Sequence, residues 1–80
     1  MSRKAYVLID VEKGKAVDVV IELNGKPGIL AADVIMGPRD VVAVVEANDV
    51  NALAHLIEKQ IVLVDGVVRT DTCLVVSGHP

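Results

Sequence analysis

The sequence predicts an α+β domain of the ferredoxin-like class, with its elements in the order β-α-β-β-α-β. Three observations support this prediction: several segments are rich in Val, Ile and Leu, one later segment has the apolar spacing of a helix, and Gly, Pro or Asp residues mark the turns. The expected strands are residues 5–12, 29–36, 41–47 and 67–76. This order gives a four-stranded antiparallel sheet with two helices on one face. We expect a single domain, residues 1–80, whose core lies in residues 5–76.

The first strand ends at Lys13-Gly14-Lys15, and the segment after it, residues 16–23, fits two patterns. A helix would place on one face Val17, Val20 and Ile21. A strand would place on one face Val17, Val19, Ile21 and Leu23. The many β-branched residues favour a strand, whereas the order of the neighbouring elements favours a helix, so the residues alone leave both open.

Turn signals separate the remaining elements. The segment Asn24 to Gly28 precedes the second strand, and Gly37-Pro38-Arg39-Asp40 reverses the chain between the second and third strands. A helix follows, capped at Asn48 or Asp49. Its apolar stripe consists of Val50, Leu53, Leu56, Ile57 and Ile61. Asp65-Gly66 turns the chain into the last strand, and residues 77–80 are expected to be a frayed tail.

Composition excludes several classes of protein. The chain is 52% hydrophobic with a formal charge of −3, and its one aromatic residue is Tyr6. A nucleic-acid-binding domain of this size needs a basic face, and RNA binding on this fold needs stacking aromatics, so neither is expected. No apolar run reaches the roughly 18 residues of a membrane span, and no signal peptide is visible, so a cytoplasmic protein is expected. The single cysteine, Cys73, excludes an internal disulfide and is expected to pack in the core.

The sheet face that the helices leave open is expected to be apolar. In the third strand, residues 41–45 are all apolar, so both faces of this strand are apolar. In the first strand, Val7 and Ile9 point to one face of the sheet, and Tyr6 and Leu8 point to the other. Soluble monomers rarely expose an apolar patch of that size. A second copy is therefore expected to cover it, which would give a homodimer with a core like a dimeric α/β-barrel.

No catalytic, metal or cofactor site is expected. His55 lies off the apolar stripe of its helix, His79 lies in the tail, and no two or three ligand residues cluster at metal-binding spacing. A small dimeric α/β-barrel enzyme is one alternative. The cavity of such an enzyme usually needs a His, Trp or Asn in a strand, and none of the four expected strands contains one. A purely structural oligomerisation module is the other alternative.

Polar residues at the reversal and in the last strand suit a small zwitterion such as an amino acid. Arg39 can bind a carboxylate, Asp40 can bind an ammonium group, and the turn that begins at Gly37 offers free backbone N–H groups. Thr70 and Thr72 are two residues apart in a strand, so they project to the same side. The candidate ligand-binding residues are Gly37, Arg39, Asp40, Thr70 and Thr72.

These motifs, taken in order, resemble a known family. Pro27-Gly28, Gly37-x-x-Asp40, Gly66-Val67 and Thr70-x-Thr72 follow one another as in the effector-binding (RAM) domain of the Lrp/AsnC transcription regulators. The resemblance covers residues 5–76. It implies a βαββαβ domain, in which residues 16–23 are a helix.

The resemblance also implies a function. Such domains pair through their sheets, often assemble into octamer-like rings, and bind amino-acid effectors between protomers near the Gly-x-x-Asp turn and the Thr-x-Thr strand. Family members usually carry a preceding helix-turn-helix domain, whereas this chain has four residues before its first expected strand. It therefore resembles the stand-alone members, which would act without direct DNA contact, through co-assembly with a full-length Lrp/AsnC regulator.

Overall fold

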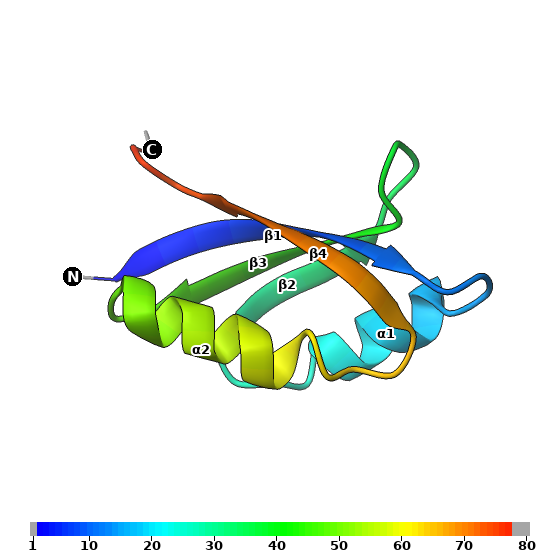
Figure 1. The fold of residues 1–80 in the computed structure, drawn as a ribbon, viewed down its shortest axis with the longest axis horizontal. Coiled ribbons are helices and arrows are strands. Elements are labelled where there is room, and N and C mark those ends of the chain that lie inside the picture. The colour runs from blue at the N-terminus through cyan, green and yellow to red at the C-terminus, as the bar shows by residue number, and fades with distance from the viewer. Residues whose placement is uncertain (1, 78–80) are drawn as a thin grey trace.

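A computed structural model describes residues 2–77 as one open sheet with two helices on one of its faces (Figure 1). The elements are β1 (Arg3–Val11), α1 (Ala16–Leu23), β2 (Ile29–Val34), β3 (Val41–Ala47), α2 (Val50–Gln60) and β4 (Val67–Leu74). The strands are antiparallel in the order β2-β3-β1-β4, so β2 and β4 form the two edges. The predicted ferredoxin-like fold is confirmed.

The hydrophobic core lies between the sheet and the helices. Every second residue of the central strands β1 and β3 points into it, as a half-covered sheet requires. These strand residues are Ala5, Val7, Ile9, Val41, Ala43 and Val45. The helices contribute Val19, Leu23, Leu53 and Ile57. Each large aliphatic side chain buried in this way stabilises the fold by about 1.5–3 kcal/mol.

Residues 16–23 form a helix, as the resemblance implied. Val19 and Leu23, four residues apart, are fully buried, whereas Val17 and Ile21 are 61% and 68% exposed. A strand would have put these four side chains on one face. Burial against β2 and β3 therefore outweighs the local preference of the β-branched residues for a strand.

Asp49 caps the second helix, so of the two predicted caps, Asn48 and Asp49, the structure selects Asp49. The Asp49 carboxylate accepts a hydrogen bond from the Ala52 backbone N–H at 2.7 Å. This bond satisfies one of the free N–H groups at the helix start. Leu53, Ile57 and Ile61 from the predicted stripe are buried, while Val50 lies near the surface at 46% exposure.

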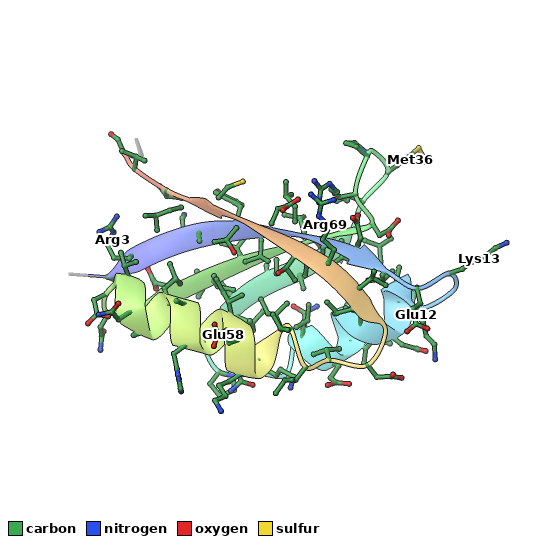
Figure 2. All side chains as sticks on the ribbon, in the orientation of Figure 1. Arg3, Glu12, Lys13, Met36, Glu58 and Arg69 are labelled. Carbon is green, nitrogen blue, oxygen red and sulfur yellow. The ribbon has the colours of Figure 1, made fainter. Side chains whose placement is uncertain are left out.

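Four strand boundaries differ from prediction. β1 begins at Arg3, two residues early, and ends at Val11, one residue early, and β4 ends at Leu74, two residues early. β2 ends at Val34, so residues 35–40 form a longer loop than the predicted tight turn. The Ile35 N–H donates to the Asp40 carbonyl at 2.9 Å across the base of this loop, and Met36 projects from it into solvent (Figure 2).

The prediction that Cys73 packs in the core is wrong, because its side chain is exposed. It pairs with Tyr6, which lies on the open face of β1. Since β4 is apolar at both parities near its end, alternation along the strand could not tell which side faces the helices. His79 lies outside the described residues.

Candidate functional site

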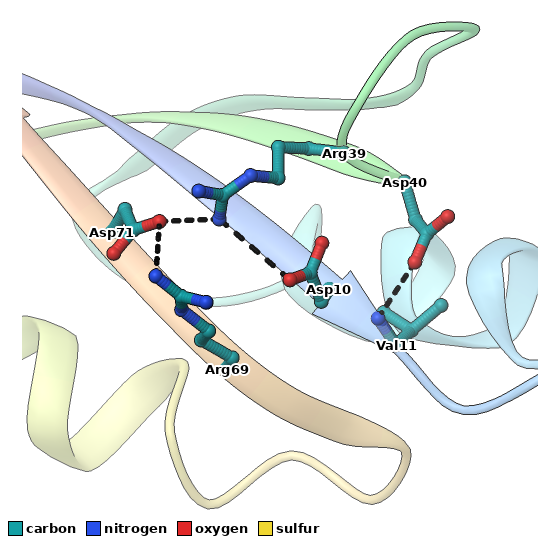
Figure 3. A network of polar contacts seen from close by, with 6 residues as sticks. All are labelled: Asp10, Val11, Arg39, Asp40, Arg69 and Asp71. Carbon is teal, nitrogen blue, oxygen red and sulfur yellow. Dashed lines mark hydrogen bonds and ion pairs between the residues drawn. The ribbon is translucent and has the colours of Figure 1, made fainter.

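Arg39 reaches from the loop 35–40 across the open face of the sheet (Figure 3). Its guanidinium Nη1 contacts the carboxylate of Asp71 on β4 and lies 3.7 Å from that of Asp10 on β1. Arg69 Nη2 approaches the same Asp71 oxygen at 3.6 Å. Arg39 Nη1 is buried, so this ion pair is more shielded from water than a typical surface pair. We call Asp10, Arg39, Arg69 and Asp71 the open-face charge cluster.

Asp40 anchors the same loop to the end of β1. Its carboxylate accepts a hydrogen bond from the Val11 N–H at 2.9 Å, and its own N–H donates to the Ile9 carbonyl at 3.1 Å (Figure 3). The β1–β3 ladder ends at the pair of Ile9 and Val41, so the Val11 N–H has no strand partner on that side and bonds to the carboxylate. Gly37 is exposed at the far side of the loop, with open space around it.

The hydrogen bond from Val11 to Asp40 leads to a stability prediction. Asp40→Ala removes the acceptor, and we expect the free energy of unfolding to fall by about 1 kcal/mol. Asp40→Asn keeps an acceptor oxygen in the same place and is the matched control. Urea denaturation of both variants measures the difference. Equal stabilities for Asp40→Ala and the natural chain would mean that water replaces the carboxylate at no cost.

Thr70 and Thr72 point to the other side of the sheet. They pair with Ile9 and Val7, whose side chains face the helices, so they share that face. There they line a groove of about 390 Å³ between α2 and β4, together with Val50, Leu53, Ala54, Ile57, Glu58, Val62 and Leu74. The groove exists because α2 packs mainly over β3 and β1 and leaves β4 largely uncovered.

The structure therefore divides the five predicted site residues. Gly37, Arg39 and Asp40 belong to one loop, and Arg39 lies on the open face, whereas Thr70 and Thr72 lie on the helix side. Sequence reasoning missed Asp10 and Asp71 as partners of Arg39, and it missed Arg69 as a second partner of Asp71. The only signal was that Asp71 alternates with the two threonines, which places it on the opposite face of β4 from them.

The open face is apolar in the middle and charged toward both ends. Tyr6 lies opposite Val44, and Leu8 lies opposite Val42. Tyr6 is 42% exposed, and the other three are partly exposed. The open-face charge cluster borders one end, and the cross-strand pair of Lys4 and Glu46 borders the other. An apolar centre with a charged border is the arrangement of a protein interface.

Other parts of the described chain offer less chemistry. Within residues 2–77 no three His, Cys, Asp or Glu side chains gather as a metal site would require. His55 is exposed on α2, as predicted. Neither helix of that range is long and apolar enough to cross a membrane.

The fold defines a small α+β domain of the ferredoxin-like class. The chain belongs to the family of the Lrp/AsnC ligand binding domain, whose model matches residues 4–79. It is thus an effector-binding domain of a regulatory family, which is not a family of enzymes. The family predicted from the motifs is confirmed.

Solved structures share this fold. TTHA0845 from Thermus thermophilus is 28% identical, with a TM-score of 0.89 over 98% of both chains. PHS023, a hypothetical protein from Pyrococcus horikoshii, is 25% identical, with a TM-score of 0.86 over 99% of this chain and 94% of that one. E. coli AsnC shares the fold at 17% identity and a TM-score of 0.88; the match covers 95% of this chain and 52% of AsnC. No curated protein matches the sequence significantly.

Proposed function

We propose that this chain is an amino-acid-binding effector domain that forms homodimers through the open face and assembles further. As a cytoplasmic protein, it would modulate transcription by co-assembly with a full-length Lrp/AsnC regulator. The family match supports effector binding. The regulator NMB0573 from Neisseria meningitidis, which shares this fold at 18% identity and a TM-score of 0.82, was solved as a complex with L-Met. That match covers 94% of this chain and 50% of NMB0573.

The observation that carries the proposal is the mixed charge of the open-face charge cluster. Arg39 and Arg69 can bind a carboxylate, and Asp10 and Asp71 can bind an ammonium group, so the cluster has partners for both ends of a zwitterion. Arg39 is already bound to Asp71. A bound amino acid would therefore replace ion pairs within the cluster by ion pairs with the ligand. Because Arg39 belongs to the loop 35–40, ligand binding would then be linked to the position of this loop.

The division of the predicted residues supports a site between copies. Arg39 and the threonine pair lie on opposite sides of one sheet, so a single small molecule cannot contact both within one chain. Arg39 of one copy and Thr70 and Thr72 of another could meet the same ligand where two copies pack together. Ligand at such a place would favour one assembly over another, which is how binding becomes regulation.

A thermal-shift panel of the twenty amino acids at millimolar concentration tests the proposal. Ligand at 100 times its Kd stabilises the folded state by about 2.7 kcal/mol. For a domain of this size each kcal/mol raises the Tm by roughly 4–8 °C. We expect one or a few amino acids to shift the Tm selectively, and light scattering to report a change in assembly with the same selectivity.

Two variants sharpen the panel. Arg39→Gln removes the cation that the ligand carboxylate needs, so the selective shift should disappear. Lys13→Gln makes the same charge change in the exposed β1–α1 turn and should retain it. A flat panel from a well-formed oligomer would instead support the structural oligomerisation module.

A further inference from the structure

The two edge strands of the sheet, β2 and β4, differ in whether side chains bond to their outward-facing backbone groups. At the β2 edge, the Asn24 side chain acts like a short neighbouring strand: its Nδ2 donates to the Ala32 carbonyl and its Oδ1 accepts from the Ala32 N–H, both at 3.0 Å. At the β4 edge, no side chain among residues 2–77 bonds to the backbone of residues 68–74. Exposed edge strands pair with other chains unless they are blocked. β4 is eight residues long and contains no proline.

The hydrogen bonding of β4 shows which of its backbone groups are free. The Val75 N–H donates to the Lys4 carbonyl at 2.9 Å, on the β1 side. In an antiparallel pair the direction of these groups alternates, so residues 73, 71 and 69 also face β1. The N–H and C=O groups of Thr70, Thr72 and Leu74 therefore point outward, where a further strand could bond to them.

We propose that the β4 edge pairs with β4 of a second copy in an antiparallel ladder centred on Thr70. In this register Thr70 lies opposite Thr70 of the second copy, and their outward backbone groups form a hydrogen-bonded pair. Arg69 then lies opposite Asp71 of the second copy, and Asp71 lies opposite its Arg69. Such a contact is isologous, since both copies use the same residues.

Charge selects this register over its neighbours. Centring the ladder on Arg69 or on Asp71 would bring two like charges directly opposite each other, which is unfavourable. Centring it on Thr72 would leave Arg69 opposite Val75 and Asp71 opposite Cys73, with no charge pair. Among these four registers, only the one centred on Thr70 brings residues of opposite charge face to face, and it does so twice.

The surroundings of β4 leave room for the second copy. Because α2 lies mainly over β3 and β1, the helix side of β4 borders the open groove and not a packed helix. Arg69 is 63% exposed, so its side chain is free to reach across the edge. The ladder also leaves Tyr6, Leu8, Val42 and Val44 uncovered, so it adds a second contact to the proposed face-to-face dimer.

Cysteine cross-linking tests the register directly. In a Cys73→Ser background, which removes the only cysteine, Thr70→Cys would place two Cα atoms about 5.5 Å apart, within the range of a disulfide. Thr72→Cys is the matched control, because its two copies would lie about 13 Å apart along the ladder. We expect Thr70→Cys to form a disulfide-linked dimer at least about 10-fold faster under mild oxidation. Equal rates, or no dimer from either variant, would overturn the proposal.

A charge-mixing experiment provides an independent test. Arg69→Asp puts like charges opposite each other in the ladder, and so does Asp71→Arg, so each alone should weaken self-association about tenfold. Mixing the two variants restores opposite charges at both positions and should restore association. A variant that has merely lost its fold, or its contact with Arg39, would not be rescued by mixing. Lack of rescue therefore contradicts the ladder.

The β4 ladder shares Arg69 and Asp71 with the open-face charge cluster, but its cross-linking test does not depend on amino-acid binding. A flat amino-acid panel would leave the cross-linking result unaffected, and a failure of cross-linking would leave the panel unaffected. The two proposals can therefore fail independently.

Discussion

Val44→Asp should abolish the face-to-face dimer and leave association only through the β4 edge. Val44 lies in the apolar centre of the open face, between Tyr6 of β1 and Ala31 of β2. If a second copy covers this face, the new carboxylate is buried without a partner, which costs about 2–5 kcal/mol. The Kd for association then rises by roughly 30-fold to several thousand-fold. Sedimentation velocity over a range of protein concentrations measures this change.

The matched control is Val17→Asp. It makes the same substitution at a residue of α1 that is 61% exposed and lies on the helix side of the molecule. Its association should match that of the natural chain. Circular dichroism checks that Val44→Asp remains folded, since aspartate in a strand costs less than about 1 kcal/mol by itself. A folded Val44→Asp variant that still associates normally would show that the open face is not the interface.

Gly28→Ala should destabilise the fold by about 2–5 kcal/mol. Gly28 has φ of +81°, a conformation that costs an L-residue about 1–2 kcal/mol. A Cβ at this position would also overlap Leu56 Cδ1 and come within 3.2 Å of its Cγ. Overpacking of this kind typically costs about 1–3 kcal/mol more. The Gly28 carbonyl accepts from the Glu46 N–H at 3.0 Å, so the backbone has little freedom to move away.

Gly14→Ala separates the two contributions. Gly14 has nearly the same φ, +82°, but nothing lies within 4 Å of the position of its Cβ. The stability of Gly14→Ala should therefore fall only by the cost of the backbone conformation. Thermal unfolding at one fixed protein concentration compares the variants, because association raises the Tm. If Gly28→Ala and Gly14→Ala lose the same stability, Leu56 moves aside freely and the close approach has no cost.

The pattern of residues was sufficient to predict most of the architecture. Alternation in β1 and the stripe of α2 are local periodicities, which the covalent geometry of strands and helices imposes on any chain. The turns at Asn24–Gly28 and Asp65–Gly66 are likewise local, because they depend on glycine and polar residues at particular positions. The apolar character of the open face could also be read from the sequence, since β3 is apolar at both parities.

Features that depend on contacts between different helices and strands could be read only from the folded structure. Residues 16–23 satisfy both periodicities, and only packing of Val19 and Leu23 against the sheet selects the helix. β4 is apolar at both parities near its end, so only its register with β1 determines that Thr70 and Thr72 face α2 while Asp71 and Cys73 face the open side.

The candidate site follows the same division. The sequence by itself identified the family, the order of the elements and the polar loop, because each of these is encoded in residues close together along the chain. The partners of Arg39 come from β1 and β4, far from it in sequence. Their meeting depends on strand order and on the direction in which the loop 35–40 folds. These are long-range properties, which are set when the sheet assembles and not by any local preference of the residues involved.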